Sequence, residues 1–71
     1  MLPFTHVGGY TLFPKVCTAA GRWHAIIEVV GGRGTVTQHL VPGAFPSVNA
    51  AELAAFVDAA GLAELLRQKE R

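Results

Sequence analysis

The stretch "RWHAIIEVVGGRGTVTQHLV", residues 22–41, decides the fold. Both of its halves are rich in β-branched residues, and the glycine-rich segment "GGRG" lies between them. This pattern is typical of two antiparallel strands joined by a short turn. A two-residue turn at Gly32 and Arg33 would put glycine at the first central position, as the type II′ geometry requires. We therefore expect a β-hairpin with its turn at these two residues.

The position of this turn determines which side chains share a face of the sheet. It pairs Val29 with Val36, and Ala25 with Leu40. The expected core face then contains Tyr10, Leu12, Val16, Trp23, Ala25, Ile27, Val29, Val36 and Leu40. The expected outer face contains Phe13, Lys15, Cys17, His24, Ile26, Glu28, Val30, Thr35, Thr37, His39 and Val41. This outer face is more apolar than a strand surface that faces only water.

A third strand precedes the hairpin. Residues 10–17, "YTLFPKVC", are rich in aromatic and β-branched side chains, and Pro14 has no N–H group for a ladder hydrogen bond, which indicates an edge strand. Residues 18–21 form the next turn, so the expected sheet covers residues 10–41. Residues 1–9 are expected to be an extended lead-in that ends in a flexible Gly-Gly joint.

The C-terminal third, residues 48–70, is expected to be helical. Asn49, followed three residues later by a glutamate, resembles a capping box, and Ser47 is a competing cap. Gly61 either ends a first helix, leaving a short second one, or lies inside one long helix with two apolar faces. The glycine rule favours the break. The stripe expected to cover the sheet is Leu53, Phe56, Val57 and Ala60.

These elements predict an α+β fold in a single domain, residues 1–71. The expected architecture is a three-stranded antiparallel β-meander, a covering α-helix and a short C-terminal helix. This layout resembles that of the double-stranded-RNA-binding domain and of the arm-type DNA-binding domain of phage integrases, and "GRWHAIIEV" looks like the middle strand of the latter. The resemblance covers about residues 10–60, concerns only the order of the elements, and assigns no functional residue. It implies nucleic-acid binding as an alternative function.

The composition points to self-association. The chain has 71 residues, of which 51% are hydrophobic and only 15% charged, and so short a chain buries only about 60% of its unfolded surface. Its single cysteine excludes an internal disulfide, so a second subunit is the favoured source of extra stability. We expect a non-enzymatic homodimer that binds another protein. The expected interface residues are Phe13, Ile26, Val30, Val41, Leu62, Leu65 and Leu66.

A possible polar site on the same outer face consists of Cys17, His24, Glu28 and His39. In the expected register the cysteine and the two histidines form a diagonal row, which does not converge as metal ligands must. We therefore assign no metal, no cofactor and no catalytic residue. A small enzyme or ligand binder that uses Cys17 and His24 is the second alternative.

Charge and hydropathy limit the partners further. A net charge of +1 gives no electrostatic footprint for nucleic acid, whose phosphates recruit several lysines and arginines. No apolar run reaches the roughly 18 residues of a membrane-spanning helix. The start of the sequence has neither the basic nor the continuous apolar part of a secretory signal, and together with the single thiol this indicates the cytoplasm.

Overall fold

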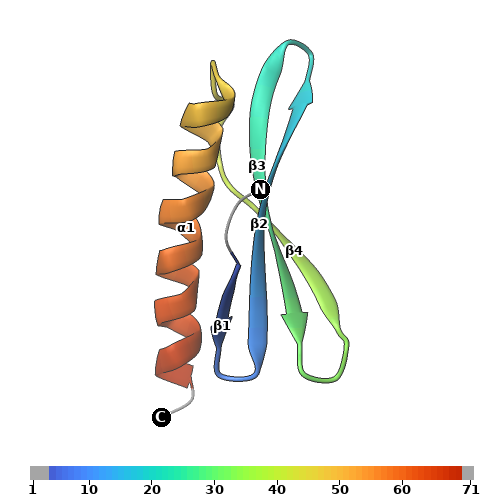
Figure 1. Ribbon diagram of the computed structural model, residues 1–71, viewed down its shortest axis with the longest axis vertical. Helices are drawn as coiled ribbons and strands as arrows, with labels where there is room; N and C mark the ends of the chain where they lie inside the picture. Colours follow the sequence, from blue (N-terminus) through green and yellow to red (C-terminus); the bar gives the residue numbers. More distant parts are fainter. Residues whose placement is uncertain (1–3, 70–71) are drawn as a thin grey trace.

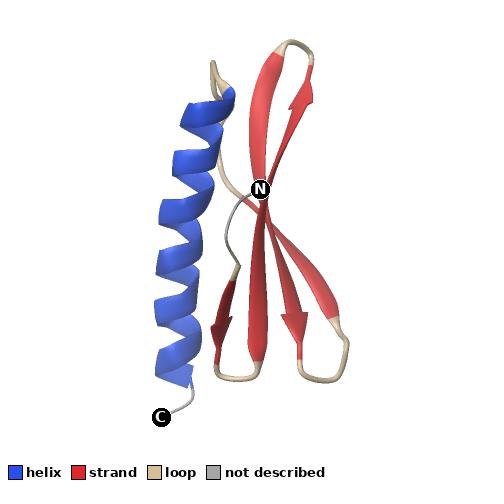
Figure 2. Cartoon of the chain, in the orientation of Figure 1, coloured by secondary structure: helices blue, strands red, loops and turns tan. Residues whose placement is uncertain are grey.

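The computed structural model describes residues 4–69 and confirms the predicted α+β class. An antiparallel sheet with the order β1-β2-β3-β4 is followed by one long helix, α1, that packs against one face of the sheet (Figure 1). The helix contacts β1, β2 and β3. The bounds of the elements are β1 Thr5–Val7, β2 Tyr10–Ala19, β3 Arg22–Gly31, β4 Val36–Leu40 and α1 Val48–Lys69 (Figure 2).

The sheet has one strand more than the sequence predicted. β1 pairs with the first residues of β2, so the expected lead-in contains a strand. Residues 1–3 and 70–71 lie outside the described part of the chain. Gly8 and Gly9 have φ values of 50° and 81°. Positive φ at both central residues is the requirement of a type I′ hairpin turn, which glycine meets without strain. The pair is therefore a tight turn and not a flexible joint.

Pro14 lies at a position where its missing N–H costs no ladder bond. The backbone of Trp23 exchanges hydrogen bonds with Phe45, and Ala25 accepts one from Val41, so the odd-numbered residues of β3 turn their backbone away from β2. Pro14 pairs with the odd-numbered Ile27, which directs its nitrogen toward the other side of β2. β1 covers β2 only from Tyr10 to Leu12, so β2 is interior there and an edge beyond it.

The turn between β2 and β3 is shorter than the expected four residues. It consists of Ala20 and Gly21, with φ values of 53° and 74°. The pairing shifts by two residues, which keeps every side chain on its expected face because the side-chain period of a strand is two. As a result Cys17 lies directly across from His24 instead of diagonally.

The turn between β3 and β4 is longer than predicted, and here the prediction is wrong. The N–H of Gly34 donates to the carbonyl of Gly31 at 3.0 Å, and the N–H of Gly31 donates to the carbonyl of Thr35 at 2.8 Å. Gly34 has a φ of 82°, so the loop is a three-residue turn that ends in a left-handed glycine. This third glycine of "GGRG", and not the second, supplies the special conformation.

One extra turn residue moves every side chain of the following strand to the other face. Val29 pairs with Thr37 instead of Val36. Val36 and Leu40, which were predicted in the core, lie on the outer face with exposed fractions of 57% and 68%. Val41, which was predicted on the outer face, is buried in the core at 9% exposure.

The helix begins at Val48, directly after the competing cap residue Ser47. The N–H of Ala50 donates to Oγ of Ser47 at 3.2 Å, so Ser47 and not Asn49 caps α1. The helix continues through Gly61, and the predicted break is wrong, whereas the alternative of one long helix is right. A terminating glycine needs a left-handed φ, and Gly61 has none. Its flanking alanines and leucine are strong helix formers that offset its low propensity.

The face that α1 turns toward the sheet is made of alanine. The buried helix residues are Ala51, Ala55, Ala59 and Ala63, each one turn after the last. Short side chains let the helix backbone lie close to the sheet, where Leu12 and Ile27 fill the space between the layers. Leu62 and Leu66 pack partly against the same core. The predicted stripe of Leu53, Phe56, Val57 and Ala60 is wrong, because all of its members are exposed.

Candidate protein-interaction surfaces

The largest exposed apolar side chains of the helix lie on the sides of it that do not face the sheet. Leu53, Phe56, Val57 and Leu65 have exposed fractions of 65%, 56%, 62% and 59%. We refer to these residues as the α1 outer face. Leu53 lies one turn before Phe56 and Val57, so the first three form one contiguous apolar patch. Large apolar groups on the outside of a helix whose inside is alanine reverse the usual amphipathic arrangement.

A shallow groove borders the α1 outer face on each side. One groove, of about 210 Å³, lies between the helix and the β1–β2 edge and is lined by Thr5, Pro14, Phe56, Ala59, Ala60, Ala63 and Arg67. The other, of about 240 Å³, lies between the helix and β4 and is lined by His39, Asp58, Gly61, Leu62 and Leu65. A ridge of side chains flanked by grooves is the shape with which helices pack against one another.

The internal core contains few large side chains. Among the described residues, Leu12 and Ile27 are the largest side chains that are fully buried. The other core members are valines and alanines. A domain of this length gains little from its own core, as the surface-to-volume relation requires.

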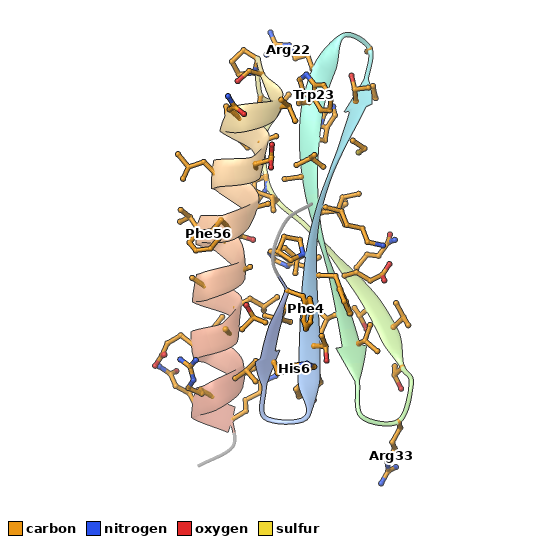
Figure 3. All side chains as sticks on the ribbon, viewed as in Figure 1. Phe4, His6, Arg22, Trp23, Arg33 and Phe56 are labelled. Atoms are coloured by element: carbon orange, nitrogen blue, oxygen red, sulfur yellow. The ribbon has the colours of Figure 1, made fainter. Side chains whose placement is uncertain are left out.

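The outer face of the sheet carries three of the predicted interface residues. Phe13, Ile26 and Val30 lie there and are half-buried. The ring of Phe4 packs at 5.6 Å from that of Phe13, between ring centres, and also approaches His6 edge-on at 5.3 Å (Figure 3). These contacts cover part of the apolar surface of this face from within the chain itself.

Of the four residues of the predicted polar site, the fold brings only Cys17 and His24 side by side. Cys17 is an exposed free thiol across from His24. The carboxylate of Glu28 accepts a hydrogen bond from Nζ of Lys15 at 3.2 Å, so it is engaged elsewhere. His39 lies on the opposite face of the sheet as a consequence of the changed turn.

His39 instead connects β4 with the helix. Its Nε2 lies 2.7 Å from Oδ2 of Asp58, and both side chains are partly exposed, at 44% and 35%. A partly exposed side-chain pair of this kind contributes about 0–1 kcal/mol to stability. It lies in the groove beside Leu65, and neither cysteine nor serine is among the lining residues of that groove.

Basic side chains do not form a platform on the sheet. Arg22 and Arg33 lie at opposite ends of the molecule (Figure 3), whose longest dimension is 40 Å. Lys15, between them, is paired with Glu28. The contiguous run of cations that phosphate backbones recruit is therefore not formed by these three residues.

Within residues 4–69, no group of three or more histidine, cysteine, aspartate or glutamate side chains is placed to hold a metal ion. In the same part of the chain, no helix has both the length and the hydropathy to cross a membrane. No family model matches the chain, and neither a curated protein nor a solved structure matches it.

Sequence reasoning assigned Leu53, Phe56 and Val57 of the α1 outer face to the core and so missed their exposure. The helical stripe with the largest apolar side chains was taken to be the side that packs against the sheet. The signal that identifies the buried side is the regular series of alanines at four-residue intervals, which is a continuous row on one side of a helix. Only Leu65, of the exposed helix residues, was among the predicted interface residues.

Proposed function

We propose that this chain is a small, non-enzymatic protein-interaction module that self-associates through the α1 outer face. The observation that carries this proposal is that α1 buries alanines and exposes Leu53, Phe56, Val57 and Leu65. Covering a side chain of this size gains about 1.5–3 kcal/mol relative to leaving it in water. A helix that turns several of them outward is therefore suited to a partner that covers them.

A second copy of the same chain is the partner that the helix fits best. α1 has 22 residues, so it offers a contact about 33 Å long. In its first half the charged residues are Glu52 and Asp58. Its last turn contains Arg67 and Lys69, of which Arg67 is paired with Glu64 at 3.1 Å. Two copies in antiparallel orientation place the acidic half of one helix near the basic end of the other. A two-fold contact of this kind is the commonest form of homodimer.

The separation of the polar candidates supports the non-enzymatic part of the proposal. A nucleophilic pair of Cys17 and His24 needs a third group that orients the imidazole and a cavity for substrate. Glu28 is paired with Lys15, and His39 lies on the other face. Neither Cys17 nor His24 lines either of the two grooves beside α1. These positions favour a protein that acts by binding through its surface over a small enzyme.

Sedimentation equilibrium of the unmodified chain tests this function. We expect the measured mass at micromolar concentration to be at least twice the 7.5 kDa of one chain. Dilution should shift the mass toward that of the monomer, since a reversible dimer obeys mass action. A mass of one chain at every concentration up to the millimolar range contradicts the proposal.

A further inference from the structure

β4 is an edge strand with unpaired backbone groups. The strand order puts it at one end of the sheet, and no strand within the described residues pairs with its outer side. Thr35 and Val41 hydrogen-bond with β3, so by strand alternation Thr37 and His39 also turn their backbone toward β3. The N–H and C=O groups of the intervening residues, Val36, Gln38 and Leu40, therefore point outward from the sheet.

The usual protections of an edge strand are missing from β4. Natural edges carry lysine, proline or a β-bulge, any of which prevents pairing with another chain. The sequence of Val36–Leu40 is VTQHL, with no lysine and no proline. The ladder with β3 runs from Val30 and Val36 to Ile26 and Leu40 without a bulge. All five residues of the strand are exposed.

The side chains of β4 are self-complementary about Gln38. Val36 and Leu40 lie two residues to either side of it, on the same outer face, and are 57% and 68% exposed. In an antiparallel pair centred on Gln38, Val36 of each copy lies opposite Leu40 of the other. Directly opposed apolar side chains in a sheet stabilise the pair. The outward-pointing backbone groups of the same three residues meet as hydrogen-bonded pairs in this register.

We propose that β4 pairs with β4 of a second copy across a two-fold axis at Gln38, and so joins two four-stranded sheets into one continuous sheet. This contact is distinct from the α1 contact proposed above and goes beyond it. It uses the sheet edge, whereas the helix contact uses the outer face of the other layer. A chain that makes both contacts forms species larger than the dimer.

The contact between two five-residue strands is small, and interfaces below about 1,200 Å² belong to weak complexes. Its own association must therefore be measured at high concentration and without the helix contact. The Phe56→Glu variant weakens the helix contact by placing a charge in the α1 outer face. In that variant, the part of the remaining self-association that depends on Gln38 reports on β4.

The test combines Phe56→Glu with a substitution at Gln38. Gln38→Pro removes the outward N–H at the centre of the proposed pair and, because that group faces away from β3, leaves the ladder within the chain intact. Gln38→Thr keeps the N–H and is the matched control. By sedimentation equilibrium we expect Gln38→Pro to weaken association roughly tenfold or more, and Gln38→Thr to leave it within about threefold. Equal association of the two variants overturns the proposal.

Amide hydrogen exchange gives a second readout that does not depend on a proline. In the Phe56→Glu variant, the amides of Val36, Gln38 and Leu40 should exchange more slowly as concentration rises, while those of Thr37 and His39 are already protected by β3. Exchange that is independent of concentration at the first three amides overturns the β4 contact. If the unmodified chain then still sediments as a dimer, the α1 proposal stands; if it is a monomer, both proposals fail.

Discussion

Replacing Ala55 with leucine is expected to lower the free energy of unfolding by about 1–3 kcal/mol. Ala55 is fully buried between α1 and the sheet, at 0% exposure, and leucine adds three carbon atoms where the layers are already in contact. For a domain of this size, each kcal/mol corresponds to roughly 4–8 °C in Tm. Urea unfolding followed by circular dichroism measures the change. The Phe56→Glu background keeps self-association from contributing to it.

The matched control is the same substitution at Ala60. This residue lies on the same helix but is exposed, so Ala60→Leu is expected to change the free energy of unfolding by less than about 0.5 kcal/mol. The opposite ranking, with Ala55→Leu tolerated and Ala60→Leu destabilising, would mean that the helix turns its larger residues toward the sheet. That result would remove the basis for an apolar outer face.

Phe56→Glu is expected to have the largest effect on self-association. Phe56 lies next to Leu53 and Val57 in the α1 outer face, and a carboxylate there would lose its water when a second copy covers the helix. A central aromatic residue of an interface contributes about 2 kcal/mol or more. Because a two-fold contact contains the substitution twice, we expect the dimer dissociation constant to rise roughly a thousandfold. Sedimentation equilibrium measures that constant.

Ala19→Glu is the control for charge in this comparison. It changes the net charge of the chain by the same amount, but at an exposed position at the end of β2, outside α1. Its expected effect on the dissociation constant is less than about threefold. Equal weakening by the two substitutions would attribute self-association to net charge and not to the apolar face. Far-ultraviolet circular dichroism establishes that both variants keep the native fold.

The α+β class followed from local signals, because strand-rich and helix-rich segments are separated by glycine and proline. The faces of β2 and β3 also followed, since the error in their turn was an even number of residues. The face of β4 did not follow. "GGRG" allows a two-residue turn at Gly32 and Arg33 or a three-residue turn ending at Gly34, and both use glycine where φ must be special. A difference of one residue reversed Val36, Leu40 and Val41.

The sequence indicated that the chain needs an interface, but it did not indicate where on the surface that interface lies. Low charge and short length indicated that the chain lacks an adequate core of its own, whereas the position of the exposed surface depends on which side of α1 meets the sheet. Both Ala55 and Leu53 belong to regular helical stripes, so periodicity alone does not rank them. The packing between the two layers determines which stripe is buried. Because Leu12 and Ile27 of the sheet already fill the space between the layers, the helix side that faces them has to carry small side chains such as Ala55.

The central claim, that a second copy covers the outer side of α1, is tested most directly by isotope-filtered NMR. In an equal mixture of labelled and unlabelled chains, nuclear Overhauser effects between copies should connect the ring protons of Phe56 with the methyl groups of Leu53 or Val57. Detection of these contacts is the result we predict. Their absence in a mixture that sediments as a dimer, or contacts between copies confined to β4, would contradict the claim.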